Sequence, residues 1–226
     1  MRKMSRMTQR CLLVIVPLVV AACSGAQPSA AGDALVRGRQ VWEGDWHAVW
    51  QIEWTDAPVG GPLVAEVWHA ADGRQRVETL EAPTGALNGL TLVEDGESAW
   101  LYDVRANRVE QGANDQVRIP LASDALDVVD WLLTEAGGAT VNSVRGDTLE
   151  SGPVTRLVMT TGARDRATLW IHDETGLPAG VALRSGPWGE VRLVTRSISL
   201  ITPLDPALFV FQAPPGAEVV SVGSKE

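Results

Sequence analysis

The stretch that decides the fold is Trp46–Trp54, WHAVWQIEW. Its apolar positions alternate with the positions between them, which is the period of a half-buried β-strand; they are Trp46, Ala48, Trp50, Ile52 and Trp54. Counted from Trp42, the tryptophans also recur every four residues, a spacing compatible with a helical stripe. Gly44-Asp45 before the stretch and the turn-rich residues 56–62 after it favour the strand. We therefore predict a strand with tryptophans on one face.

Segments on both sides of this stretch predict further short strands. They lie between turn signals such as Asp72-Gly73 and Asp95-Gly96, which suit tight antiparallel hairpins. We expect strands over residues 63–70, 75–81, 90–93, 98–104, 108–111, 140–144, 154–160, 167–172, 179–184, 190–200 and 208–211.

Two segments have the spacing of amphipathic helices. Residues 32–43 place apolar residues at helical spacing behind Asp33, a residue suited to an N-cap. Residues 123–137 run from Ser123, a good N-cap, to Gly137, a good C-cap. This second helix has an apolar stripe and an acidic row that we expect to be solvated; the stripe is Leu126, Val129, Leu132 and Leu133, and the row is Asp124, Asp127 and Asp130.

The beginning of the chain predicts export and lipid attachment. A cationic leader precedes an apolar run over residues 11–22, and twelve helical residues reach about 18 Å, short of a ~30 Å hydrocarbon core. The run ends Val20-Ala21-Ala22-Cys23, which resembles a bacterial lipobox, in which the cysteine receives diacylglycerol. The alternative is an ordinary secretory signal beside which Cys23 is incidental. We expect a lipoprotein signal peptide over 1–22, a flexible tether over 23–32 from acylated Cys23, and one folded domain over 33–226.

The charge of the processed chain disfavours nucleic acid as a partner. The chain of 226 residues has 19 basic and 28 acidic side chains, and removal of four leader cations leaves 15 and 28, a net charge of −13. Phosphates and anionic head groups repel such a body, whereas acyl chains anchor a protein without electrostatic help.

The sequence carries no recognisable catalytic or metal-binding motif. His47, His69 and His172 lie on three separate predicted strands without zinc-ligand spacing. The motifs GxSxG, GxxxxGK[ST] and GxGxxG do not occur. An acidic row on one helix also lacks the loop that wraps calcium. We therefore expect neither an enzyme nor a cofactor nor a metal site.

Three stretches resemble the LolA/LolB-like superfamily of bacterial envelope lipoprotein carriers, which includes RseB (MucB) N-terminal domains and LppX/LprG-type lipoproteins. They are VEDGESAWLYD (93–103), LWIHDETGLP (169–178) and PLDPALFVFQAPPGA (203–217). The resemblance implies an α+β fold, in which helices cover the concave face of a twisted antiparallel half-barrel sheet. It also implies an apolar cavity between the helices and the sheet, which accepts acyl chains or a hydrophobic partner segment.

The implied cavity would be lined from the tryptophan strand and the second helix. The candidates are Trp46, Trp50, Ile52 and Trp54 from the strand, with Leu126, Val129, Trp131 and Leu133 from the helix. The other interpretation of this stripe is ordinary core packing. Arg192 and Arg196, on one face of a predicted strand, are expected to face solvent.

Two functions remain open at this point. The first is a membrane-tethered extracytoplasmic carrier or acceptor of lipid or acylated lipoprotein, held through Cys23 in an outer membrane or on the outer leaflet of the cell membrane. The second is an RseB-like regulatory module that senses envelope lipid or lipoprotein stress through a protein partner. RseB-type proteins carry a second C-terminal domain, for which the residues after Val219 leave no room, and this favours the first.

Overall fold

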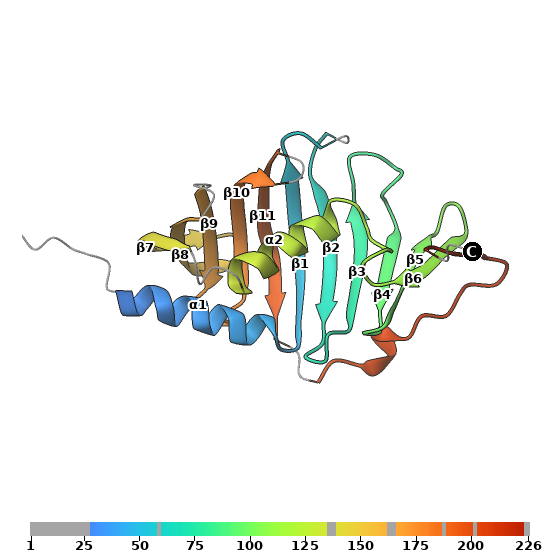
Figure 1. The fold of residues 1–226 in the computed structure, drawn as a ribbon, viewed down its shortest axis with the longest axis horizontal. Helices are drawn as coiled ribbons and strands as arrows, with labels where there is room; N and C mark the ends of the chain where they lie inside the picture. The colour runs from blue at the N-terminus through green and yellow to red at the C-terminus, as the bar shows by residue number, and fades with distance from the viewer. Residues whose placement is uncertain are drawn as a thin grey trace, which may run out of the picture.

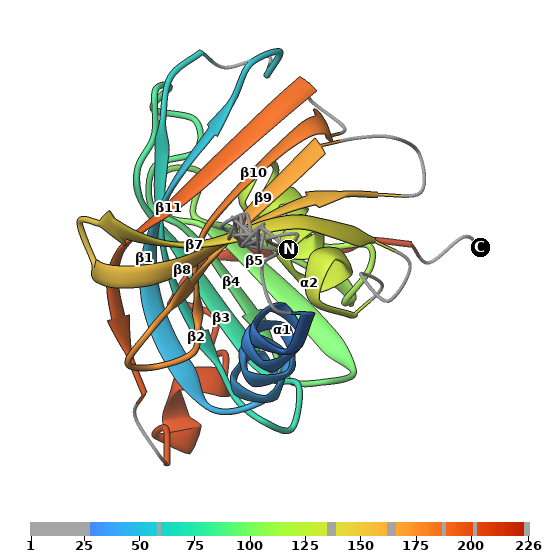
Figure 2. The same ribbon diagram turned by 90° about the vertical axis from the view of Figure 1, so that its left-hand side faces the viewer.

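One curled 12-stranded sheet carries two helices on its concave face (Figures 1 and 2). The computed structural model describes residues 28–57, 60–134, 139–161, 166–186, 189–200 and 203–223. The helices are α1 (Pro28–Trp42) and α2 (Ala122–Thr134), with a 3-10 helix η2 (Pro206–Phe209) near the C-terminus. No helix in this described part is long and apolar enough to cross a bilayer.

The strands pair in the order β12-β6-β5-β4-β3-β2-β1-β11-β10-β9-β8-β7. Neighbouring strands are antiparallel except β12, which pairs parallel with β6. The bounds are β1 (Trp46–Trp54), β2 (Leu63–His69), β3 (Gln75–Glu81), β4 (Leu90–Glu94), β5 (Ser98–Asp103), β6 (Arg108–Ala113), β7 (Thr140–Leu149), β8 (Gly152–Thr160), β9 (Arg166–His172), β10 (Pro178–Gly186), β11 (Gly189–Ser199) and β12 (Glu218–Ser221).

The tryptophan stretch is a strand at the centre of this sheet, as its alternation predicts. β1 joins two meanders, because it pairs with β2 on one side and with β11 on the other. Its residues alternate between buried and half-buried along the whole strand. The expected α+β half-barrel with helices on its concave face is therefore confirmed.

The helix boundaries differ from the prediction at their N-termini. α1 begins at Pro28, inside the predicted tether, so Asp33 lies within the helix rather than capping it. Proline suits this first position because it has no N–H to leave unpaired. α2 begins at Ala122, and the Ser123 hydroxyl accepts a hydrogen bond from the Ile119 amide of the preceding loop. The predicted C-cap Gly137 lies outside the described residues.

The predicted strand over 208–211 is wrong. Residues Pro206–Phe209 form η2 instead, because the Asp205 carboxylate accepts a hydrogen bond from the Ala207 amide at 2.9 Å and Pro206 fixes the first turn. Phe209 packs with Ala70 and Leu204. Further along, Phe211 stacks on Trp100 with ring centroids 6.2 Å apart. Trp68 and Trp100 alternate with residues of the helix-covered core, so this C-terminal segment crosses the opposite face of the sheet.

Small residues let α1 lie close to the sheet and to α2. Ala31 and Ala34 are buried. A Cβ at Gly38 would lie 2.9 Å from Ile171 Cδ1 of β9 and 3.3 Å from Leu133 Cδ2 of α2. Larger side chains at these positions would force the backbone of α1 away from β9 and α2.

Candidate functional site

The residues predicted to line a cavity all gather between β1 and α2. Seven of the eight are buried within one core cluster: Trp46, Trp50, Ile52, Trp54, Leu126, Val129 and Leu133. Trp131 is partly buried and packs against the margin of that cluster. In this conformation the space beneath the helices is therefore occupied by the protein's own side chains.

A stack of aromatic rings joins α1 to this cluster. Trp42, the last residue of α1, stacks on Trp46 and Trp50 with ring centroids 4.8 and 5.9 Å away. The Trp42 Nε1 donates to Asp130 Oδ1 of α2 at 3.1 Å. The Trp50 Nε1 is buried and has no hydrogen-bond partner among the described residues. The four-residue spacing of the tryptophans reflects this stack across the junction from α1 to β1.

His69 closes the stack from β2. Its ring lies 5.2 Å from that of Trp46, and its Nδ1 pairs with the Gly44 carbonyl at 2.9 Å. Burial lowers the pKa of His69, outweighing the opposing effects of the Gly44 carbonyl and nearby carboxylates. The neutral imidazole then donates from Nδ1 to that carbonyl.

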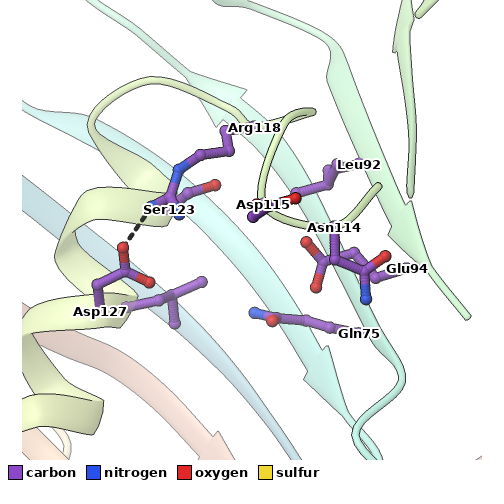
Figure 3. A pocket seen from close by; sticks show the side chains of 9 residues that line it. Gln75, Leu92, Glu94, Asn114, Asp115, Arg118, Ser123 and Asp127 are labelled. Atoms are coloured by element: carbon purple, nitrogen blue, oxygen red, sulfur yellow. Dashed lines mark hydrogen bonds and ion pairs between the residues drawn. The ribbon is translucent and has the colours of Figure 1, made fainter. Parts of the chain in front are cut away.

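An open pocket of about 240 Å³, here called the α2 pocket, lies where the first turns of α2 meet β3 and β4 (Figure 3). Leu92 and Leu126 are its apolar residues, and both are buried. Polar side chains from three elements complete the lining: Gln75 and Glu94 from the sheet, Asn114, Asp115 and Arg118 from the loop after β6, and Ser123 and Asp127 from α2.

Arg118 holds two carboxylates of α2 at one side of the α2 pocket. Its Nη2 lies 2.5 Å from Asp127 Oδ2 and 3.4 Å from Asp124 Oδ1. With Asp130 bonded to Trp42, the whole acidic row is engaged by partners. Asp127 and Asp130 are exposed, as expected of a solvated row, but the loop after β6 and the end of α1 also bring an arginine and an indole to these carboxylates, which the sequence did not indicate.

Glu94 is the perturbed acid of the α2 pocket. Burial raises its pKa to about 7, against the lowering effect of Arg118 and with a small raising effect from Asp127. No hydrogen bond from another described residue reaches its carboxyl group. Asn114 Oδ1, on the same side in Figure 3, is buried without a partner among the described residues. Sequence reasoning missed both residues, because only the strand register brings them together.

Glu94 makes stability depend on pH. Its folded pKa lies above its unfolded value near 4.5, so the folded state binds more protons between these values and loses stability as the pH rises through them. We expect Glu94→Gln to raise the free energy of unfolding near pH 8 by about 1–2 kcal/mol and to flatten this decline. Urea denaturation across the range measures it. Glu97 lies on the exposed turn after β4, so Glu97→Gln should change neither the free energy of unfolding near pH 8 nor its decline with pH. If stability still declines with pH in Glu94→Gln as it does in the parent, the raised pKa of Glu94 is contradicted.

Two further pockets lie away from the α2 pocket, one beside β1 and β11 and one beside α1 and β7. One of about 400 Å³ places Trp54 beside Arg192 and Glu190 at one end of β1 and β11. Another of about 440 Å³ lies between Arg37 of α1 and Arg145 of β7. Arg192 and Arg196 are exposed as expected, and Arg196 donates to Gln51.

The histidines are separate from one another. His47 pairs with Glu66 at 2.7 Å, and His172 Nε2 contacts the Ser151 carbonyl at 3.0 Å. Across the described ranges, no three His, Cys, Asp or Glu side chains are grouped so as to hold a metal ion.

Comparison with known proteins relates this chain to solved structures only. No family model and no curated protein matches it. An uncharacterized conserved protein from Thermus thermophilus is 18% identical, with 85% of this chain and 99% of that one covered and a TM-score of 0.56. MucB is also 18% identical, at 86% and 66% coverage and a TM-score of 0.55.

A second MucB structure matches equally well. The complex of MucA and MucB from Pseudomonas aeruginosa gives 20% identity, 85% and 64% coverage and a TM-score of 0.54. The present chain thus spans just under two thirds of the MucB chains. Since the sequence resembles the superfamily that includes MucB, and the curled sheet with two helices matches MucB in space, this chain has the LolA/LolB-like fold.

Proposed function

We propose that this chain is an extracytoplasmic lipoprotein, anchored through Cys23, that holds lipid or an acylated lipoprotein against the concave face of its sheet. The observation that carries the proposal is the continuous apolar layer of β1 and its neighbours, on which α1 and α2 lie. Acyl chains bind such a layer by burying apolar area, at about 25 cal/mol per Å², with little demand on geometry. No catalytic group is needed for that role.

Movement of α1 is the step that admits cargo in this proposal. Over residues 28–38 α1 meets the core largely through the small residues Ala31, Ala34 and Gly38. Its larger apolar contacts are Leu35 and Val41, which are partly buried, and Trp42 at its end. A polar connection from α1 to α2 is the hydrogen bond from Trp42 Nε1 to Asp130 Oδ1. An acyl chain that replaces α1 on the sheet restores the apolar contacts that α1 gives up.

Lipid content tests the proposal directly. We expect the tag-free Cys23→Ala variant to leave the membrane fraction and to yield about one lipid per chain on solvent extraction and mass spectrometry. An unrelated extracytoplasmic protein purified in parallel sets the background. Membrane retention of Cys23→Ala contradicts the anchor, and a lipid content at background contradicts the carrier role.

Two glycines of α1 supply matched variants for the same assay. Valine at Gly38 collides with Ile171 and Leu133, whereas Gly32 has nothing within 4 Å of an added Cβ. We expect Gly38→Val to lift α1 and to speed uptake of a fluorescent fatty acid severalfold. Gly32→Val should take up the probe at the parental rate, and equal rates for both variants exclude α1 as the lid.

The second candidate is a regulatory module that binds a protein partner. It is favoured by the likeness to MucB, one structure of which is a complex with MucA. In this case the purified variant carries no stoichiometric lipid, and an envelope protein is recovered with it by cross-linking in cells.

A further inference from the structure

The two halves of the sheet carry opposite charge. Strands β7–β11 contain six arginines against two acidic residues, a net charge of +4, whereas β2–β6 contain two arginines against six acidic residues, a net charge of −4. The processed chain as a whole has a net charge of −13, so a positive half is contrary to its composition. The repulsion that this composition predicts between the chain and anionic head groups therefore does not apply to both halves alike.

The arginines of β7–β11 lie on the face of the sheet that the two helices leave uncovered. Successive residues of a strand point to opposite faces, and each of these arginines is next in sequence to a residue buried or partly buried on the helix-covered side, as Arg156 is to Leu157. We call this surface the arginine face; it consists of Arg145, Arg156, Arg166, Arg184, Arg192 and Arg196.

Most of the arginine face is free to meet an external anion. Within the described part of the chain, four of its arginines are exposed and form no ion pair: Arg145, Arg166, Arg184 and Arg192. The arginines of the acidic half are already neutralised within that half, because Arg76 pairs with Glu78 and Arg108 with Glu110. Exposed guanidinium groups without carboxylate partners are the donors that phosphates bind best.

One pair of arginines favours an external anion directly. Arg145 and Arg156 face each other across β7 and β8, an arrangement that destabilises a sheet when the charges are alike. Arg156 is held in place over the Trp170 ring at 5.7 Å, and the Trp170 Nε1 donates to Asp147 Oδ2 at 3.1 Å. Asp147 offsets only part of the positive charge of the pair, so an anion beside the exposed Arg145 reduces the remaining repulsion.

The positive half is also the end of the molecule from which the proposed anchor leaves. The first turns of α1 border β7, where Ala30 and Asp33 share a pocket with Val144 and Arg145. Figure 1 shows the start of α1 beside β7–β9 at one end of the long axis, with β5 and β6 toward the other end. Six strand spacings separate β7 from β2, roughly 29 Å along the sheet. That is more than the Debye length of about 10 Å at 0.1 M salt, so repulsion of the acidic half is screened when the β7 end meets a membrane.

We propose that the arginine face docks on the anionic phospholipid head groups of the membrane that holds the anchor. Each basic side chain near an anionic surface contributes about fivefold in affinity. The proposal rests on the membrane-anchored role proposed above. It uses neither the concave face nor the movement of α1, so docking can fail while cargo binding succeeds, and the reverse.

Vesicle flotation tests this docking without the anchor. The protein is the chain from residue 23 onward with Cys23→Ala, which keeps every described residue and lacks both the acyl group and the cationic leader. At low ionic strength we expect binding to phosphatidylcholine vesicles with about 30% phosphatidylglycerol at least about tenfold above binding to phosphatidylcholine alone. About 0.5 M NaCl should abolish the difference. Equal binding to the two vesicles, or binding to neither, overturns the proposal.

Two matched double variants separate the arginine face from the net charge. Arg145→Gln with Arg184→Gln removes two exposed arginines of the arginine face and should weaken binding at least about tenfold. Arg105→Gln with Arg108→Gln removes two exposed arginines beside β6, an identical change of net charge, and should bind as the parent does. Circular dichroism confirms the fold of each variant. An equal loss in both variants, or tighter binding to immobilised poly-glutamate than to the vesicles, overturns the assignment to head groups.

Discussion

Replacing Trp50 by alanine is expected to lower the free energy of unfolding by about 3–5 kcal/mol. Trp50 is 1% exposed at the centre of β1, and its ring lies 5.9 Å from that of Trp42 and 5.5 Å from that of Trp46. Truncation therefore leaves a cavity in the middle of the sheet, with close-packed neighbours on all sides. Urea denaturation monitored by circular dichroism measures the change.

Two further variants identify the cause. Trp50→Phe keeps most of the ring and removes an indole N–H that has no acceptor among the described residues, so we expect it to cost less than half as much. Trp170→Ala removes a half-buried indole from β9 and should also cost clearly less. A loss below about 1 kcal/mol for Trp50→Ala would mean that this position tolerates empty space, as an acyl-binding surface does.

Replacing Trp42 by alanine is expected to cost about 3 kcal/mol and to free α1. Trp42 is 7% exposed and provides both the ring stack on Trp46 and the hydrogen bond to Asp130. Hydrogen exchange should accelerate at amides 28–42 more than in β1, because local opening of α1 becomes easier than global unfolding. Uptake of a fluorescent fatty acid should quicken in parallel.

The two contributions of Trp42 are separable. Trp42→Phe retains a stacking ring without the N–H donor, so it reports the bond to Asp130, which we expect to contribute about 1 kcal/mol. Trp131→Ala removes a partly buried indole from α2 and serves as the control for ring loss. Uniform exchange along α1 and β1 in Trp42→Ala would show that α1 does not open separately.

The sequence predicted those elements whose apolar residues recur at the period of a strand or a helix. The alternation over Trp46–Trp54 indicates a strand because each residue's face follows from its neighbours alone. The apolar stripe of α2 likewise indicates the buried face of that helix, and Leu126, Val129 and Leu133 lie there. The envelope-protein resemblance supplied the curvature and the placement of the helices, which periodicity does not contain.

The features that sequence missed depend on contacts between distant residues. Glu94 lies beside Asn114 because β4, β5 and β6 pair in one register, and neither residue has a local pattern that marks it. β12 was not predicted, because its parallel pairing with β6 requires the chain to cross the sheet first. Asp33 and Ser123 are good capping residues by type, yet α1 begins at Pro28 and α2 at Ala122, and the Ser123 hydroxyl accepts from the Ile119 amide before the helix.

Because α1 begins at Pro28, only a short segment would separate the folded body from an anchor at Cys23. From Cys23 to Pro28 an extended chain reaches no farther than about 18 Å, less than the length of α1 itself at about 22 Å. With Cys23 in a bilayer, the end of the molecule where α1 lies beside β7 would stay within about 18 Å of the lipid head groups. With Cys23 anchored as proposed, this protein would reach only cargo at the surface of its own membrane, and the short segment between Cys23 and Pro28 would limit how far α1 can move.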